Sequence, residues 1–138
     1  MSQETPARRV PAESAFTDSA AFWQGTREGK LVLQYCTKTG RFQHFPRPVS
    51  LATGRRTLGW KEVSGNGTIY SHTVLRTPGL GADGRLPCPL ALVDLDEGVR
   101  ILANLPGADL DRLKIGARVR LVWDTLAGDA RYPAFALT

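Results

Sequence analysis

Apolar and polar residues follow two different periods along this chain. Residues 18–28 (DSAAFWQGTRE) follow residues of N-cap type and stop before Gly29, which predicts a short helix. From residue 30 onward apolar and polar residues alternate, first over 30–35 (KLVLQY) and later over 68–76 (TIYSHTVLR). The chain is therefore predicted to be mainly β, with a short N-terminal helix.

The second half of the chain carries the most regular β pattern. Runs at 68–76, 89–95, 99–105, 117–124 and 132–138 predict five strands, with a short helical turn at 106–114 between the third and the fourth. A small, five-stranded, partly closed barrel is typical of an OB-fold. An SH3-like barrel is the alternative, and the helical turn before the fourth strand favours the OB-fold.

Composition divides the chain of 138 residues into four parts. Residues 1–14 contain charges and prolines and are expected to be a disordered tail; residues 15–29 hold the helix. Residues 30–57 form a small, loop-rich ribbon module, and 58–138 form the barrel. No apolar run is long enough to cross a bilayer, and the N-terminus has no secretory h-region. We expect a cytoplasmic protein without a membrane partner, whose Cys36 and Cys88 are free thiols rather than a disulfide.

A short pattern occurs twice in the ribbon module. The segments 36-CTKTG-40 and 50-SLATG-54 share the spacing of a zinc knuckle, C-x-x-C-G. The four ligand positions are Cys36, Thr39, Ser50 and Thr53. Structural zinc takes thiolates and imidazoles, whereas Ser and Thr hydroxyls stay protonated and bind it poorly.

The spacing therefore predicts two knuckle turns without a bound metal. His44 is the nearest additional ligand, and Cys36 with His44 gives two ligands, which is not a structural site. We expect the hydroxyls to bond to backbone N–H groups and to each other instead. From spacing alone, a plain polar loop and a ribbon that has lost its metal remain open.

Positive charge is concentrated in the first half of the chain. The net charge is +5, and eight basic residues lie between Arg27 and Lys61, where Glu28 is the one acidic residue. Four of these form a cluster on the ribbon: Arg41, Arg47, Arg55 and Arg56. Such a cluster indicates either an anionic partner or a solvated charged face.

The sequence contains no pair of nucleophile and base, so no catalytic residues are predicted. His72 lies within a predicted strand without a partner, and Cys88 lies between two prolines. The glycine-rich segment 79–84 (GLGADG) lacks the lysine of a phosphate-binding loop. The aromatic pair Phe22 and Trp23 cannot share one stripe of the helix, so one of them is expected to need a second surface, which suggests a docking partner.

Several motifs in this order resemble a known family. They are FWQG (22–25) with EGKL (28–31), the knuckle positions, QHFPRP (43–48), WKEVSGNGTIY (60–70) and ALVDLDEGVRIL (91–102). The chain resembles small bacterial and archaeal proteins that join an N-terminal helix and a rubredoxin-like zinc ribbon to a C-terminal OB-fold. It departs from them at the metal site, where the family usually carries four cysteines.

The resemblance implies a non-catalytic accessory subunit that docks on a thiolase-like enzyme. Such a subunit helps to bind or position an acyl-CoA during acyl transfer, thiolysis or retro-aldol cleavage. It would hold no tight cofactor, with a coenzyme A thioester as its ligand, and the arginine cluster would face a CoA phosphate or an acidic rim of the partner. The alternative is a nucleic-acid-binding OB module, which the charge favours and the few aromatic residues on the barrel strands disfavour.

Overall fold

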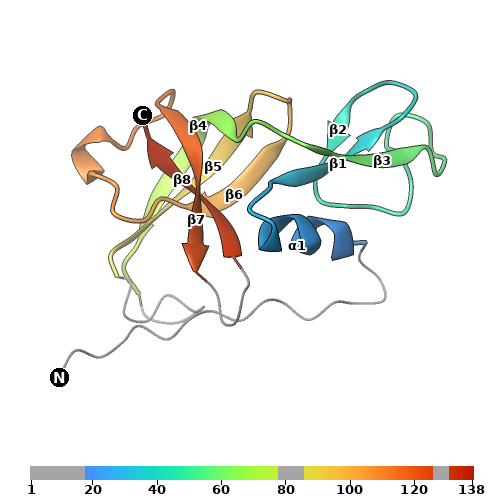
Figure 1. The fold of residues 1–138 in the computed structure, drawn as a ribbon. Coiled ribbons are helices and arrows are strands. Elements are labelled where there is room, and N and C mark those ends of the chain that lie inside the picture. The colour runs from blue at the N-terminus through green and yellow to red at the C-terminus, as the bar shows by residue number, and fades with distance from the viewer. Residues whose placement is uncertain (1–17, 78–85, 126–130) are drawn as a thin grey trace.

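The computed structural model describes residues 18–77, 86–125 and 131–138 of the chain. Within these residues the chain forms an α-helix, a three-stranded sheet and a five-stranded sheet (Figure 1). The mainly β architecture predicted from the sequence is confirmed. The expected tail at 1–14, the start of the helical segment at 15–17 and the glycine-rich segment 79–84 lie outside the described residues.

Helix α1 (Ala20–Arg27) lies within the predicted range of 18–28. Its N-cap is Ser19, which makes no side-chain capping bond, and the chain leaves the helix through Gly29 at φ 73°. Residues Phe22, Trp23 and Thr26 are buried on one side of the helix. Because only one side is apolar, α1 depends on packing against the rest of the molecule.

The ribbon sheet consists of β1 (Val32–Cys36), β2 (Phe42–Gln43) and β3 (Leu58–Glu62), in the order β2-β1-β3. Strand β3 runs antiparallel to β1 over its whole length, from Cys36 opposite Leu58 to Val32 opposite Glu62. Residues 58–62 are predicted from the sequence to belong to the barrel, whereas their pairing with β1 places them in the ribbon sheet. Alternation identifies a strand but does not identify its partner, which explains the difference.

The barrel contains β4 (Asn66–Leu75), β5 (Cys88–Leu95), β6 (Arg100–Asn104), β7 (Arg118–Thr125) and β8 (Arg131–Leu137). The strand order is β6-β5-β4-β7-β8, all antiparallel, and the edge strands β6 and β8 contact each other. A 3-10 helix, η1 (Leu110–Arg112), lies between β6 and β7. The five strands and the helical insertion before the fourth confirm the predicted OB-fold.

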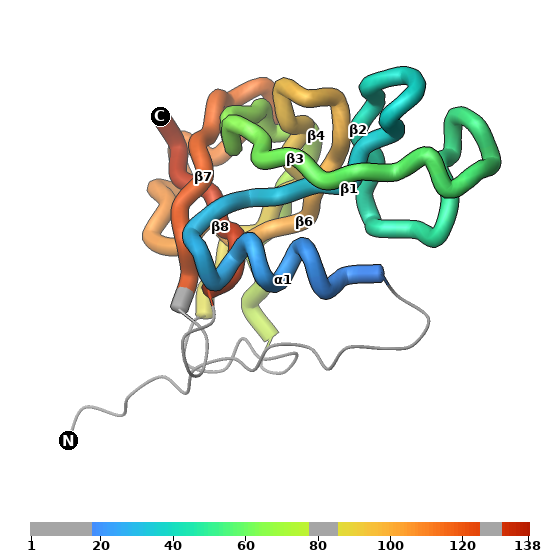
Figure 2. Tube along the Cα trace, turned by 45° about the vertical axis from the view of Figure 1, so that its right-hand side comes forward, coloured from blue at the N-terminus to red at the C-terminus, as the bar shows by residue number. Residues whose placement is uncertain are grey.

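The helix, ribbon and barrel share one apolar core. It extends from Phe22 and Trp23 through Leu31 and Leu33 into the barrel, where Phe135 is fully buried. Helix α1 contacts both β1 and β8, and Figures 1 and 2 show it lying along the junction of the barrel and the ribbon sheet. The junction is therefore a fixed part of the fold, and an apolar cavity lies there.

Candidate functional site

Both knuckles retain the backbone turn of a metal-binding ribbon. In the first, the Gly40 N–H donates to the Cys36 carbonyl at 2.8 Å, and in the second the Gly54 N–H donates to the Ser50 carbonyl, also at 2.8 Å. Both glycines have positive φ, 74° and 68°, a conformation that other residues adopt at a cost. The two segments therefore form equivalent turns, which supports a ribbon over a plain polar loop.

Each knuckle hydroxyl also accepts a hydrogen bond from its own turn. Thr39 Oγ1 accepts from the Arg41 N–H at 3.3 Å, Ser50 Oγ from the Ala52 N–H at 3.1 Å, and Thr53 Oγ1 from the Arg55 N–H at 3.2 Å. The expectation that hydroxyls bond to backbone N–H groups is confirmed. These bonds orient the three hydroxyls toward the space between the two turns.

A fifth residue, Thr57, joins the Cys36 thiol of the first knuckle to the Thr53 hydroxyl of the second. Cys36 Sγ and Thr57 Oγ1 are 3.6 Å apart, and Thr57 Oγ1 and Thr53 Oγ1 are 2.8 Å apart. Hydrogen bonds from the Ser50, Thr39 and Thr57 hydroxyls lower the pKa of Cys36 to about 6, against the opposing effect of burial. We refer to Cys36, Thr39, Ser50, Thr53 and Thr57 as the thiol–hydroxyl cluster.

The donors in this cluster do not fit zinc. It offers one thiolate and no imidazole, and among the described residues no group of three His, Cys, Asp or Glu side chains could hold a metal ion. His44, the other potential ligand, lies elsewhere: its ring stacks near those of Phe22 and Phe45, at centroid distances of 6.0 and 4.5 Å. His44 therefore belongs to a different site.

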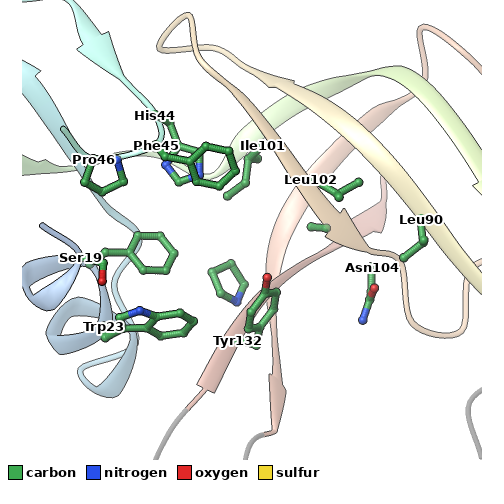
Figure 3. A pocket seen from close by; sticks show the side chains of 13 residues that line it. Ser19, Trp23, His44, Phe45, Pro46, Leu90, Ile101, Leu102, Asn104 and Tyr132 are labelled. Atoms are coloured by element: carbon green, nitrogen blue, oxygen red, sulfur yellow. The ribbon is translucent and has the colours of Figure 1, made fainter. Parts of the chain in front are cut away.

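That site is an apolar cavity of about 330 Å³ at the junction of helix, ribbon and barrel (Figure 3). Its walls come from α1, from the loop after β2, and from strands β5, β6 and β8. The lining residues are Ser19, Phe22, Trp23, His44, Phe45, Pro46, Leu90, Ile101, Leu102, Ala103, Asn104, Tyr132 and Pro133. Since none of these described residues has a charged side chain, the cavity suits an apolar group.

Aromatic contacts hold the cavity open on the helix side. Phe22 and Trp23 pack edge to face at 5.0 Å, and Trp23 faces Tyr132 at 5.9 Å. Each is only 8% exposed, so the second surface expected for this pair is supplied by the chain itself, by His44 for Phe22 and by Tyr132 for Trp23. Burial lowers the pKa of His44, whose Nδ1 has no hydrogen-bond partner among the described residues.

The exposed apolar residues at the rim are Phe45 and Leu102, which are 68% and 56% exposed. Figure 3 shows Phe45 on the ribbon side and Leu102 on the barrel side of the cavity. Two large exposed apolar side chains beside a cavity make this a candidate contact surface. The aromatic pair of the helix could be identified from the sequence, whereas Phe45, Leu102 and Tyr132 could not, because they meet only in the folded chain.

The loop that carries Phe45 is fixed by two buried glutamines. Gln34 Oε1 accepts from Gln43 Nε2 at 2.7 Å and from the Arg47 N–H at 2.9 Å, and Gln34 Nε2 donates to the Arg47 carbonyl at 2.9 Å. Gln43 in turn donates to the Val49 carbonyl and accepts from the Leu51 N–H. This network positions both Phe45 and the backbone of Arg47.

The four arginines of the predicted cluster separate into two pairs. Arg47 and Arg56 line a second cavity, of about 360 Å³, together with Gln34 and Trp60. Arg41 and Arg55 are exposed and are not among the lining residues of this cavity. The acidic Asp18 also lines this cavity, so two arginines, one carboxylate and an indole ring surround it, and the arginines make it a candidate site for a phosphate.

The remaining polar candidates have other roles. Asp94 pairs with Arg100 and Asp96 with Arg118, while Glu97 accepts hydrogen bonds from Ser64. Cys88 is buried at the start of β5, and His72 is exposed on β4. No helix in the described part of the chain is long and apolar enough to cross a membrane.

Comparison with known proteins gives matches over both parts of the chain. A family model described as the ChsH2 rubredoxin-like zinc ribbon domain matches residues 23–49, and one described as the ChsH2 C-terminal OB-fold domain matches residues 60–124. A DUF35 domain-containing scaffold protein of Pyrococcus furiosus is 31% identical over 101 residues, which cover 73% of this chain and 74% of the relative.

Two further relatives belong to enzyme assemblies by their names. The 3-oxo-4,17-pregnadiene-20-carboxyl-CoA hydratase alpha subunit of Mycobacterium tuberculosis is 36% identical over 111 residues, which cover 80% of this chain and 35% of the relative. A solved structure described as an Ltp2-ChsH2(DUF35) aldolase superposes with a TM-score of 0.82 at 30% identity, covering 93% of this chain and 98% of that one. The chain spans less than half the length of the hydratase subunits that it matches.

Proposed function

The chain belongs to the ChsH2/DUF35 family, whose members join a zinc ribbon to an OB-fold, and on this basis we propose that it is a non-catalytic accessory subunit of an enzyme that acts on acyl-CoA. It docks on a thiolase-like partner and helps to bind or position the thioester in acyl transfer, thiolysis or retro-aldol chemistry. The observation that carries this proposal is the apolar cavity with Phe45 and Leu102 exposed at its rim.

The names of the relatives support an accessory role. One is called a scaffold protein, one an alpha subunit of a CoA-ester hydratase, and one is part of an aldolase with two named components. Among the described residues, the acidic side chains near the barrel hairpin are paired with arginines or with Ser64. We therefore assign no general acid or base to them. The chemistry would then come from the partner.

The docking surface of the proposal consists of Phe45, Leu102 and the cavity between them. Burying two large apolar side chains that are more than half exposed would contribute roughly 1.5–3 kcal/mol each if they became fully covered. Phe22 and Trp23 form the wall behind them. They act by shaping the cavity rather than by direct contact, because each is 8% exposed in the free chain.

The cavity at Arg47 and Arg56 is proposed to receive the phosphate end of the coenzyme. Coenzyme A carries a 3′-phosphate and a diphosphate, to which arginine can donate two hydrogen bonds at once. Trp60 lines the same cavity and offers a ring against which an adenine could stack. Arg41 and Arg55 serve as internal controls, because they carry the same charge and do not line this cavity.

Co-expression with a candidate thiolase-like partner tests the docking surface. Phe45→Asp and Leu102→Asp should each abolish co-purification of the two proteins, whereas Ile115→Asp, at a position 71% exposed and outside the cavity lining, should leave it intact. Equal co-purification of all three variants would refute the docking surface. Activity of this chain by itself would refute the accessory role.

Calorimetric titration of the purified complex with coenzyme A tests the phosphate site. Arg47→Ala/Arg56→Ala should weaken binding by at least roughly tenfold, since hydrogen bonds to charged groups are worth about 1.5–3 kcal/mol. Arg41→Ala/Arg55→Ala should leave the affinity close to that of the native complex. The reverse result would refute the site, and retention of oligonucleotide at moderate salt would favour the nucleic-acid-binding alternative.

A further inference from the structure

We propose that this ribbon closes without metal, through the thiol–hydroxyl cluster, and that the cluster keeps the two knuckles arranged as a metal site that lacks only three of its four thiolates. The family is defined by a zinc ribbon, and the donors in this chain do not fit zinc. The ribbon nevertheless has two equivalent turns and a close structural relative. Something other than a metal must therefore hold the turns together.

The cluster links the two knuckles across the position where their side chains meet. The first knuckle supplies Cys36 and Thr39, and the second supplies Ser50 and Thr53. The link between them runs through the Thr57 side chain, which lies beside Cys36 of the first knuckle and beside Thr53 of the second. A tetrahedral metal would connect the same four positions, with one bond to each.

Thr57 completes the link from a fifth position, just before strand β3. Its hydroxyl lies 3.6 Å from Cys36 Sγ and 2.8 Å from Thr53 Oγ1, so it bridges one side chain of each knuckle. Its own carbonyl accepts from the Thr37 N–H at 2.9 Å, which holds it against the first turn. Thr57 therefore connects the two knuckles to each other and to the ribbon sheet.

The hydrogen bonds of the cluster stabilise the ribbon because the groups that form them are buried. Ser50 is 0% and Cys36 1% exposed, so a donor or acceptor left unpaired there could not return to water. A ribbon held in this way folds whatever the metal supply and is insensitive to chelators. A ribbon held by zinc would lose most of its stabilisation when the metal is removed.

The first test measures metal content and stability of the native chain grown in zinc-supplemented medium. Elemental analysis should find well below one zinc per chain, and a chelator should leave the Tm unchanged.

Thr57→Val should lower the Tm by roughly 3–8 °C, because it removes both bridging bonds. Thr37→Val, at an exposed position in the adjacent turn, should leave the Tm unchanged. One zinc per chain with a chelator-sensitive Tm would overturn the proposal, as would equal Tm values for the two variants.

The second test asks whether the knuckles are still arranged as a metal site. Thr39→Cys/Ser50→Cys/Thr53→Cys, prepared with and without Thr57→Ala to make room at the centre, is titrated with Co²⁺ and followed by the visible absorption of tetrahedral cobalt thiolates. Binding of one Co²⁺ per chain by either variant supports the proposal, and a lack of binding by both folded variants overturns it. Neither test involves the partner or coenzyme A, so its result is independent of the proposed function.

Discussion

Replacing Gln34 by leucine should destabilise the chain by loosening the loop that carries Phe45 and Arg47. Gln34 is 3% exposed on strand β1, and its side-chain amide makes three hydrogen bonds. One comes from Gln43 and two join the backbone of Arg47, all between 2.7 and 2.9 Å. Leucine has a similar volume, so the substitution removes the bonds without opening a large cavity.

The expected decrease in the free energy of unfolding follows from the removal of these three hydrogen bonds. Each contributes about 1 kcal/mol net, and a buried group left unpaired costs about 1–3 kcal/mol. Arg47 is exposed, so water can partly replace the bonds to its backbone. We therefore expect the free energy of unfolding to fall by about 2–3 kcal/mol, which corresponds to a Tm lowered by roughly 6–15 °C for a chain of this size.

Urea unfolding followed by tryptophan fluorescence measures this loss directly. The matched control is Gln24→Leu, an exposed helix position whose side chain makes a 3.1 Å bond to Glu28, with an expected cost below about 0.5 kcal/mol. If Gln34→Leu unfolds within about 0.5 kcal/mol of the native chain, the two glutamines do not fix this loop. Contacts other than the two glutamines would then position Phe45.

Three further predictions concern the core and the two titrating groups. Phe135→Ala should cost about 3–5 kcal/mol in urea unfolding, because Phe135 is 0% exposed; a cost below about 1 kcal/mol would contradict the core assignment. Burial lowers the pKa of His44 from 6.5, so the unfolded chain binds a proton that the folded chain resists. The free energy of unfolding should therefore decrease as the pH falls below about 6.5, and His44→Gln should reduce this slope; identical slopes would contradict the burial of the imidazole. Hydrogen bonds from Ser50, Thr39 and Thr57 lower the pKa of Cys36 to about 6, so the ultraviolet thiolate absorbance of a Cys88→Ser variant should rise around that pH rather than near 9.0; a midpoint near 9.0 would show that the hydroxyls do not contact the sulfur.

Local patterns in the sequence were sufficient to predict the elements of the fold. Alternation identified the five barrel strands, and the Gly after each knuckle identified turns whose positive φ the structure confirms. The donor chemistry of Cys36, Thr39, Ser50 and Thr53 argued against zinc before any contact was known. These features can be predicted from the sequence because each depends on residues close together along the chain.

Two features could be assigned only from the tertiary structure: which strands pair with each other, and which side chains from different segments meet. Strand β3 alternates like a barrel strand, and only its hydrogen bonds to β1 assign it to the ribbon sheet. Thr57 follows the second knuckle by three residues and gives no signal of its own, yet it bridges Cys36 and Thr53.

The sequence by itself therefore determined the order and type of the elements, the two knuckle turns and the shortage of metal ligands. The tertiary structure decided which residues meet: Phe45 with Leu102 at one cavity, and Arg47 with Arg56 at another. The physical reason is that periodicity and turn chemistry act over a few residues. A cavity is instead made by side chains from distant segments, whose positions depend on the packing of helix, ribbon and barrel around a shared core.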